Sequence, residues 1–161
     1  MSKLSRSSHA LVTGGGRGIG RAVAAVLSEA GATVTILGRN RATLDEAVAS
    51  GAAAFAVAAD VSDAASVKSA VAEAAARQPI DILVANAGAA ESAPFGRSDA
   101  ALFQRMMDVN FMGVVHATQA VLPGMIERRH GRIVAVASTA GLPAVKRARA
   151  RPGASLQKLE V

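Results

Sequence analysis

The stretch that decides the fold is residues 9–20, with the sequence HALVTGGGRGIG. Its first five residues form a short apolar run, which predicts a buried strand that ends at the glycines. The residues that follow place Ile19, Val23, Val26 and Leu27 on one helical face, which predicts a helix over residues 19–30. A strand, a glycine-rich turn and a helix in this order begin a βαβ unit.

The same alternation of apolar runs and helical patterns continues along the chain. Further strands are predicted at residues 33–37, 53–59, 80–85 and 132–137, and further helices at 42–50, 63–77 and 102–125. The strand candidates are apolar throughout, as expected for strands that helices cover on both faces. We therefore predict an α/β fold, a Rossmann-like doubly wound parallel sheet of about five strands. This domain covers residues 1–145 and is truncated after the fifth strand.

The composition restricts the class of protein. Hydrophobic residues make up 51% and charged residues 19% of the chain, which is typical of a globular domain. The absence of cysteine excludes disulfides and cysteine nucleophiles, and the three histidines lack the spacing of metal ligands, so we expect no metal site. The N-terminus does not resemble a signal peptide, and the apolar stretch 109–126 carries several polar residues. We therefore expect a cytoplasmic protein that makes no contact with a membrane.

The net charge of +6 is concentrated near the end of the chain. Residues 146–161 hold five of the basic residues and one acidic residue, without apolar periodicity, which predicts a basic irregular tail outside the domain. The rest of the chain is nearly neutral, and the tail has no aromatic residues between its charges. A nucleic-acid partner working through this tail is therefore the weakest of the functional alternatives.

The glycine-rich turn predicts a nucleotide site. Glycine permits positive φ angles and lets a pyrophosphate approach the backbone closely. The N-terminus of the following helix supplies free N–H groups and the positive end of the helix dipole. An ordinary glycine-rich turn is the alternative, but the position between the first strand and the first helix favours nucleotide binding.

Five elements, in this order, resemble those of the short-chain dehydrogenase/reductase family over roughly residues 8–145. They are the spacing Thr13-Gly14-x-x-x-Gly18-x-Gly20, the pair Asp60-Val61, the triplet Asn86-Ala87-Gly88, Asn110, and the strand that leads to Ser138. The resemblance implies an oxidoreductase that uses a nicotinamide dinucleotide to reduce a carbonyl or oxidise an alcohol of a small molecule. It also implies that the protein is able to form a homo-oligomer through the long helix.

The resemblance assigns a role to each element. The cofactor would be bound by three groups of residues, which are Thr13, Gly14, Arg17, Gly18, Ile19 and Gly20 in the turn, Asp60 and Val61 beside the adenine, and Asn86, Ala87 and Gly88 after the fourth strand. Ser138 matches the catalytic serine, and Asn110 matches the residue that holds a water of the proton relay. Ordinary explanations also exist, since Asp60 can cap a turn, Asn86 can form an Asx-turn and Ser138 can simply end a strand.

The choice of cofactor depends on the charges after the second strand. NAD sites commonly place an acidic residue there for the ribose 2′-hydroxyl, whereas NADP sites supply an arginine for the 2′-phosphate. Gly38 stands at the acidic position, Arg39 follows it, and Arg17 lies in the glycine turn. Two solvated surface arginines are the alternative, but their place around one predicted pocket favours NADP(H) over NAD(H).

The family pattern breaks after about Val145. The family follows its serine with a Tyr-x-x-x-Lys element that transfers the substrate proton, but this chain contains no tyrosine. In the related stretch PGASL, Pro152 stands in place of the tyrosine and Leu156 in place of the lysine, while Lys158 comes two positions late. We therefore expect a frameshift or an artificial end of the chain, and the alternative function is a non-catalytic dinucleotide-binding fragment or pseudoenzyme.

Overall fold

The structure is a computed structural model that describes residues 8–91 and 94–137. Strands and helices alternate as the sequence predicts. The elements are β1 (His9–Thr13), α1 (Gly18–Glu29), β2 (Thr33–Gly38), α2 (Arg41–Ala49), β3 (Phe55–Ala58), α3 (Ala64–Arg77), β4 (Ile82–Ala85), the 3-10 turn η1 (Phe95–Arg97), α4 (Ala100–Met107), the π-helical turn η2 (Asp108–Met112), α5 (Gly113–Glu127) and β5 (Arg132–Ala135).

The five described strands form one parallel sheet in the order β3-β2-β1-β4-β5. The chain starts in the middle of the sheet, moves outward to β3 and then crosses back to β4 on the other side of β1. Neighbouring strands β1 and β4 therefore send their following segments to opposite faces of the sheet. In α/β sheets of this kind, ligands bind at such a switch point, beyond the carboxyl ends of the strands.

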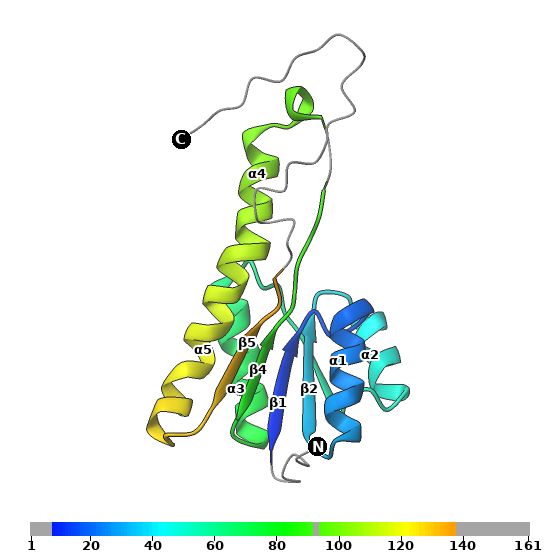
Figure 1. Cartoon of the computed structure of the whole chain (residues 1–161), viewed down its shortest axis with the longest axis vertical. Coiled ribbons are helices and arrows are strands. Elements are labelled where there is room, and N and C mark those ends of the chain that lie inside the picture. The colour runs from blue at the N-terminus through cyan, green and yellow to red at the C-terminus, as the bar shows by residue number, and fades with distance from the viewer. Residues whose placement is uncertain (1–7, 92–93, 138–161) are drawn as a thin grey trace.

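Helices cover the two faces of the sheet, with α1 and α2 on one face and α3 and α5 on the other (Figure 1). Alternate residues of β1 face opposite layers, because successive side chains of a strand point to opposite sides. Ala10 and Val12 pack with the layer of α1 and α2, and Leu11 packs with the layer of α3 and α5. This arrangement confirms the prediction of a doubly wound parallel sheet.

One detail of the predicted packing is wrong. Ile19 and Val26 were expected to face inward from α1, but 67% of Ile19 and 62% of Val26 is exposed. The buried residues of α1 are Gly20 and Ala24, while Val23 and Leu27 pack partly buried against the same layer, as predicted. A Cβ atom on Gly20 would collide with the carbonyl oxygen of Gly14, so the helix lies too close to the end of β1 for a large side chain.

The predicted long helix at residues 102–125 is interrupted. It consists of α4 and α5 joined by the π-helical turn η2, and none of the residues of α4 is buried. In Figure 1, α4 extends past the carboxyl edge of the sheet, while α5 lies along it. Within the described residues, this run from Ala100 to Glu127 is the one helix long and apolar enough to cross a membrane by length and composition. A core helix passes the same test, and α5 buries Ala117, Val121 and Met125 in the layer it shares with α3.

Candidate functional site

A cavity of about 640 Å³ lies at the carboxyl ends of β1 to β4, at the switch point of the sheet. It is lined by eleven of the residues that the sequence singled out, namely Gly14, Arg17, Gly18, Ile19, Gly20, Arg39, Asp60, Val61, Asn86, Ala87 and Gly88. A second hollow of about 590 Å³, between α1 and residues 50–52, contains none of the polar residues at the strand ends. The first cavity is therefore the candidate functional site.

The floor of the site is the glycine turn between β1 and α1. Gly14 has a φ angle of +67°, and a Cβ atom there would lie 2.8 Å from the Cα atom of Ala87. Only glycine fits both the backbone conformation and this close approach. Arg17 directly precedes α1, and its side chain makes no capping hydrogen bond to the helix. The first N–H groups of α1 therefore face the site and can receive an anion.

Thr13 lies behind the cavity wall and joins the ends of β1 and β4. Its side chain is buried, and its hydroxyl oxygen accepts hydrogen bonds from the backbone N–H groups of Asn86 and Ala87, each over 3.0 Å. The side-chain amide of Asn86 donates in return to the backbone oxygen of Thr13, also over 3.0 Å. These reciprocal bonds hold the turn after β1 against the turn after β4, so both walls of the cavity keep a fixed distance.

Asp60 and Arg39 face each other at the ends of β3 and β2. The guanidinium of Arg39 lies 3.9 Å from Oδ2 of Asp60, and both side chains are substantially exposed. Partial burial acts to raise the pKa of Asp60. Hydrogen bonds from the hydroxyl and N–H of Ser62, together with the charge of Arg39, outweigh this effect and hold the pKa below its ordinary value. The Asp60 carboxylate is therefore ionised and available as a hydrogen-bond acceptor.

Val61 contributes backbone and packing to the same wall. Its side chain is buried, and a Cβ atom on Gly113 would lie 2.9 Å from Val61, so α5 packs closely against it. Nδ1 of His116 lies 2.9 Å from the backbone oxygen of Val61. His116 therefore joins α5 to the end of this wall.

Asn110 lies in η2, beside the cavity and not in its lining. Its Oδ1 accepts the N–H of Ala89 over 3.0 Å, and its Nδ2 donates to the oxygen of Ala89 over 2.9 Å. The π-helical turn brings this side chain to the segment after β4, so the long helix and the end of the strand are joined at the site.

Ser138, the candidate catalytic serine, lies outside the described residues. So does the predicted basic tail, residues 146–161. The last described residues continue the sheet, because the N–H of Val136 donates to the oxygen of Ala85 over 2.9 Å. Within residues 8–91 and 94–137, there is no group of three or more histidine or acidic side chains placed to hold a metal ion.

The sequence did not predict three further residues that line the cavity and are larger than alanine. They are Asn40, Thr43 and Val109. Asn40 caps α2 by accepting the N–H of Thr43 over 3.2 Å. Thr43 approaches Gly16, since a Cβ atom there would lie 2.7 Å from its hydroxyl oxygen. The spacing of Asn40 and Thr43 is that of a helix N-cap, a signal that could have placed the start of α2 at this edge.

Comparison with known proteins identifies the family of this chain. The family model described as short chain dehydrogenase matches residues 8–150. The D-erythrulose reductase of Gallus gallus is 39% identical over 142 residues, which cover 88% of this chain and 56% of the relative. The 2-dehydro-3-deoxy-L-rhamnonate dehydrogenase (NAD(+)) of Sphingomonas is 39% identical, over 82% of this chain and 54% of the relative.

Among solved structures, the 3-oxoacyl (acyl-carrier-protein) reductase of Agrobacterium tumefaciens with NADP bound is 36% identical, with a TM-score of 0.75. The match covers 85% of this chain and 55% of that structure. The chain thus spans little more than half the length of the relatives it matches. Because the family model matches residues 8–150, most of the sequence, this chain belongs to the short-chain dehydrogenase family of oxidoreductases.

Proposed function

We propose that the site at the ends of β1 to β4 binds a nicotinamide dinucleotide and prefers NADP(H) to NAD(H). The observation that carries the preference is the pair Arg17 and Arg39 on the cavity wall, with Gly38, the last residue of β2, at the position where NAD sites commonly have an acid. One relative is named as NAD-dependent and another was solved with NADP. Membership of the family therefore leaves the choice to these residues.

The residues present fit such a cofactor. Gly18 borders open space, where a Cβ atom would meet nothing within 4 Å, and the open N-terminus of α1 supplies hydrogen-bond donors for a pyrophosphate. The ionised Asp60 offers an acceptor for the adenine end, and Arg39 offers a bidentate partner for a phosphate on the ribose. A bound nicotinamide would supply the hydride, and the protein would orient it.

For the intact protein we propose the reduction of a carbonyl, or the reverse oxidation of an alcohol, in a small-molecule substrate. Asn110 and Ser138 are the proposed members of the proton relay. The side chain of Asn110 is already held by both backbone groups of Ala89, so its position is fixed before any ligand binds. A homo-oligomer and a cytoplasmic location remain predictions.

The second candidate function is that this chain binds a dinucleotide but does not turn over a substrate. It is favoured by one fact of the sequence, the absence of any tyrosine to carry the substrate proton. In this form the protein holds the adenosine and pyrophosphate end of the cofactor and leaves the substrate oxygen without an acid.

Fluorescence titration of the full chain with NADPH and with NADH tests the cofactor proposal. We expect saturable binding of both dinucleotides, with NADPH bound about tenfold more tightly, since a charge-assisted phosphate contact contributes about 1.5–3 kcal/mol. Equal affinities for the two dinucleotides would contradict the preference. Binding of neither would contradict the site itself.

A further inference from the structure

His9 is a buried ionisable side chain at the opposite end of the sheet from the cofactor site. It is the first residue of β1 and is completely buried. Its Nδ1 lies 2.7 Å from the backbone oxygen of Gln78, the residue that follows α3. Its Nε2 lies 2.8 Å from the hydroxyl oxygen of Thr35 in β2, which is also completely buried. One imidazole ring therefore bridges β1, β2 and the end of α3.

The chemistry of these two partners fixes the form of the ring. The oxygen of Gln78 can only accept a hydrogen bond, so Nδ1 must carry a proton. In the neutral ring, Nε2 then has a free lone pair, and the hydroxyl of Thr35 donates to it. Both ring nitrogens are thus satisfied when the ring is neutral.

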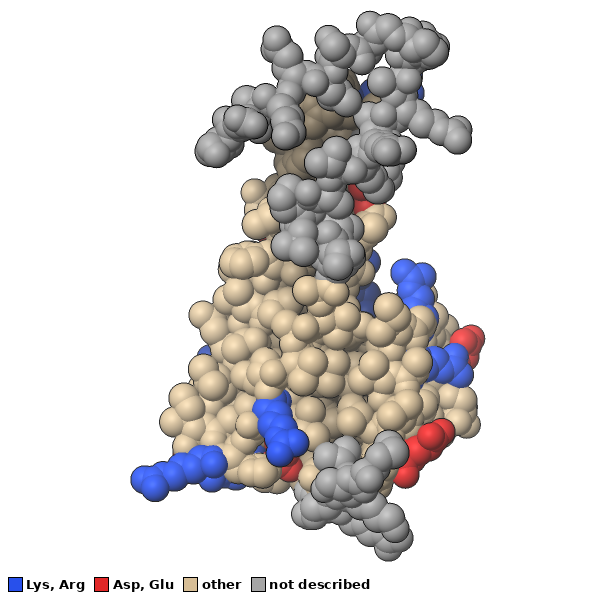
Figure 2. Space-filling model, viewed as in Figure 1, with Lys and Arg blue, Asp and Glu red and all other residues tan. Residues whose placement is uncertain are grey.

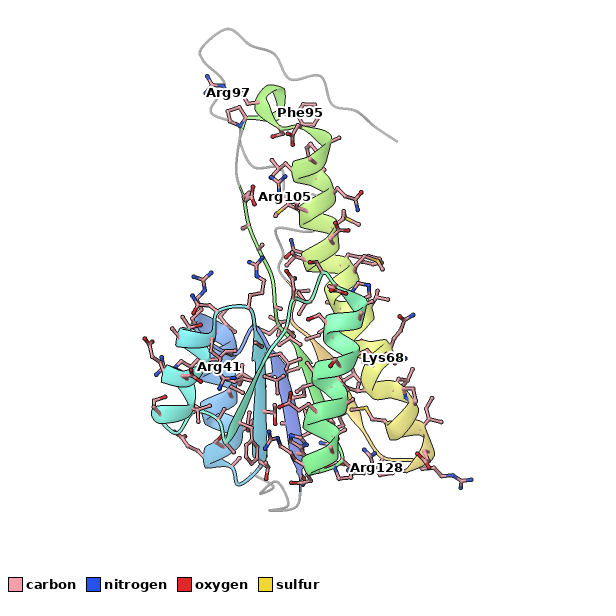
Figure 3. The ribbon with its side chains drawn as sticks, turned by 180° about the vertical axis from the view of Figure 1, so that it is seen from behind. Arg41, Lys68, Phe95, Arg97, Arg105 and Arg128 are labelled. Atoms are coloured by element: carbon pink, nitrogen blue, oxygen red, sulfur yellow. The ribbon has the colours of Figure 1, made fainter. Side chains whose placement is uncertain are left out.

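The backbone of His9 belongs to the same cluster. Its N–H donates to Oδ2 of Asp81 over 3.1 Å, and its oxygen accepts the N–H of Asp81 over 2.9 Å. Asp81 in turn lies 3.6 Å from Arg128, which donates to the oxygen of Ile80 over 2.7 Å. Figure 3 places Arg128 at the end of α5, at the end of the molecule away from α4. The amino ends of β1 and β4 are therefore tied to both helices of one layer.

We propose that the neutral His9 ring is an acid-sensitive structural contact. It holds β1, β2 and the segment between α3 and β4 together, and the packing of these elements weakens when the ring takes up a proton. A proton on Nε2 makes that nitrogen a donor to the Thr35 oxygen, so the proton of the Thr35 hydroxyl loses its acceptor. It also puts a positive charge at a completely buried position. Because β1 leads directly into the glycine turn, loosening at His9 would reach the cofactor site through the same strand.

The charged groups around His9 set the direction of the effect. Burial lowers the pKa of His9 from its ordinary value of 6.5, while the Gln78 oxygen and the charge of Asp81 act to raise it, and burial dominates. Asp81 is the nearest acid and is itself paired with Arg128. On the α3 side, the charged side chains are Arg77, which lies 4.7 Å above the ring of Phe55, and its ion-pair partner Glu73.

The direction in which stability changes with pH follows from the lowered pKa of His9. Below a pH of 6.5, the unfolded chain binds a proton at this histidine that the folded chain does not bind. The stabilising effect is therefore fully present above that pH. It is lost as the pH falls from 6.5 to the lowered pKa of the folded state.

Urea unfolding of the full chain across a pH series tests the proposal. We expect the unfolding equilibrium constant to rise as the pH falls from about 8 to about 5.5, by at most about tenfold, which is the limit for one proton bound only by the unfolded chain. His9→Gln, which cannot titrate, should lose this pH dependence, whereas the exposed His130 allows a matched control, His130→Gln, that should keep it. The same pH dependence in His9→Gln as in the parent chain would overturn the proposal.

Nitrogen NMR of the histidine rings in the parent chain provides a measurement that needs no variant. At about pH 6 we expect a smaller protonated fraction of His9 in the folded chain than of an exposed histidine, with the neutral ring carrying its proton on Nδ1. A His9 ring that titrates at its ordinary pKa in the folded chain would also overturn the proposal.

Discussion

The central strand β1 and the edge strand β5 differ in how the fold surrounds them. All five residues of β1 are buried, and the strand pairs with β2 and β4. All four residues of β5 are exposed, and its partner among the described strands is β4. In Figure 2, the central part of the face turned to the viewer carries few charged side chains. The exposed fractions of Ile133 and Val134 in β5 are 39% and 50%.

This difference separates two parts of the proposed machinery. The residues proposed to bind the cofactor follow β1 to β4, where strands are packed on both faces and their ends are joined by Thr13 and Asn86. The residue proposed to act on the substrate, Ser138, follows β5, which the described chain leaves uncovered. We therefore expect cofactor binding to be the more robust property and turnover the more fragile one.

The largest expected effect concerns turnover. This chain should oxidise NADPH in the presence of carbonyl compounds about 100- to 10,000-fold more slowly than a family member with an intact Tyr-x-x-x-Lys element, because general acid–base catalysis contributes that much. A steady-state assay over a panel of carbonyl compounds measures this. Comparable rates would show that another proton donor is present.

The next effect concerns stability. Leu11→Ala in β1 should lower the free energy of unfolding by about 2–5 kcal/mol, because Leu11 is fully buried and its removal leaves a cavity. Ile133→Ala in β5 is the matched substitution. It should lower the free energy of unfolding by much less than Leu11→Ala, since 39% of Ile133 is already exposed. Urea unfolding of both variants checks the contrast. Equal losses would mean that β5 is covered as well as β1.

A smaller effect is expected at the joint between β1 and β4. Thr13→Val removes the oxygen that accepts from both Asn86 and Ala87 and should cost about 1–3 kcal/mol, the penalty for leaving buried N–H groups unpaired. The variant should also bind dinucleotides more weakly, because the two cavity walls would no longer be fixed. Amide exchange should become faster at Asn86 and Ala87. Unchanged exchange at both amides would remove Thr13 from this role.

An effect of similar size is expected on the cofactor preference. Arg39→Ala should weaken NADPH binding about tenfold or more and leave NADH nearly unchanged, because a charge-assisted phosphate contact is worth about 1.5–3 kcal/mol. Arg41→Ala is the matched control, since Arg41 is exposed, pairs with Asp45 and does not line the cavity. Calorimetric titration of both variants distinguishes a specific contact from a loss of general charge. An equal effect from Arg41→Ala would point to general charge.

The sequence predicts the order of strands and helices well, because apolar runs of β1 and β2 are buried on both faces and carry no competing pattern. It also predicts most of the cavity wall, because strand ends of a parallel sheet meet at one edge. It does not predict η2, where the partner of Asn110 is the backbone of Ala89, 21 residues away in sequence. A contact at that separation leaves no local pattern.

The orientation of α1 is a second failure with a physical cause. Hydrophobicity favours Ile19 and Val26 as part of the inward face, whereas the close approach to Gly14 leaves no room for a side chain at Gly20. Packing distance thus overrides the hydrophobic pattern next to the site. The same close approach leaves Ile19 exposed on the cavity wall.

Hydrogen–deuterium exchange of the full chain, with and without saturating NADPH, tests the central claim most directly. The claim is that the cofactor is held by the ends of β1 to β4 and not by β5. We expect protection on binding at residues 13–20, 38–40, 60–61 and 86–88, with residues 132–137 unchanged. Protection confined to residues 132–137, or no protection at the glycine turn, would contradict it.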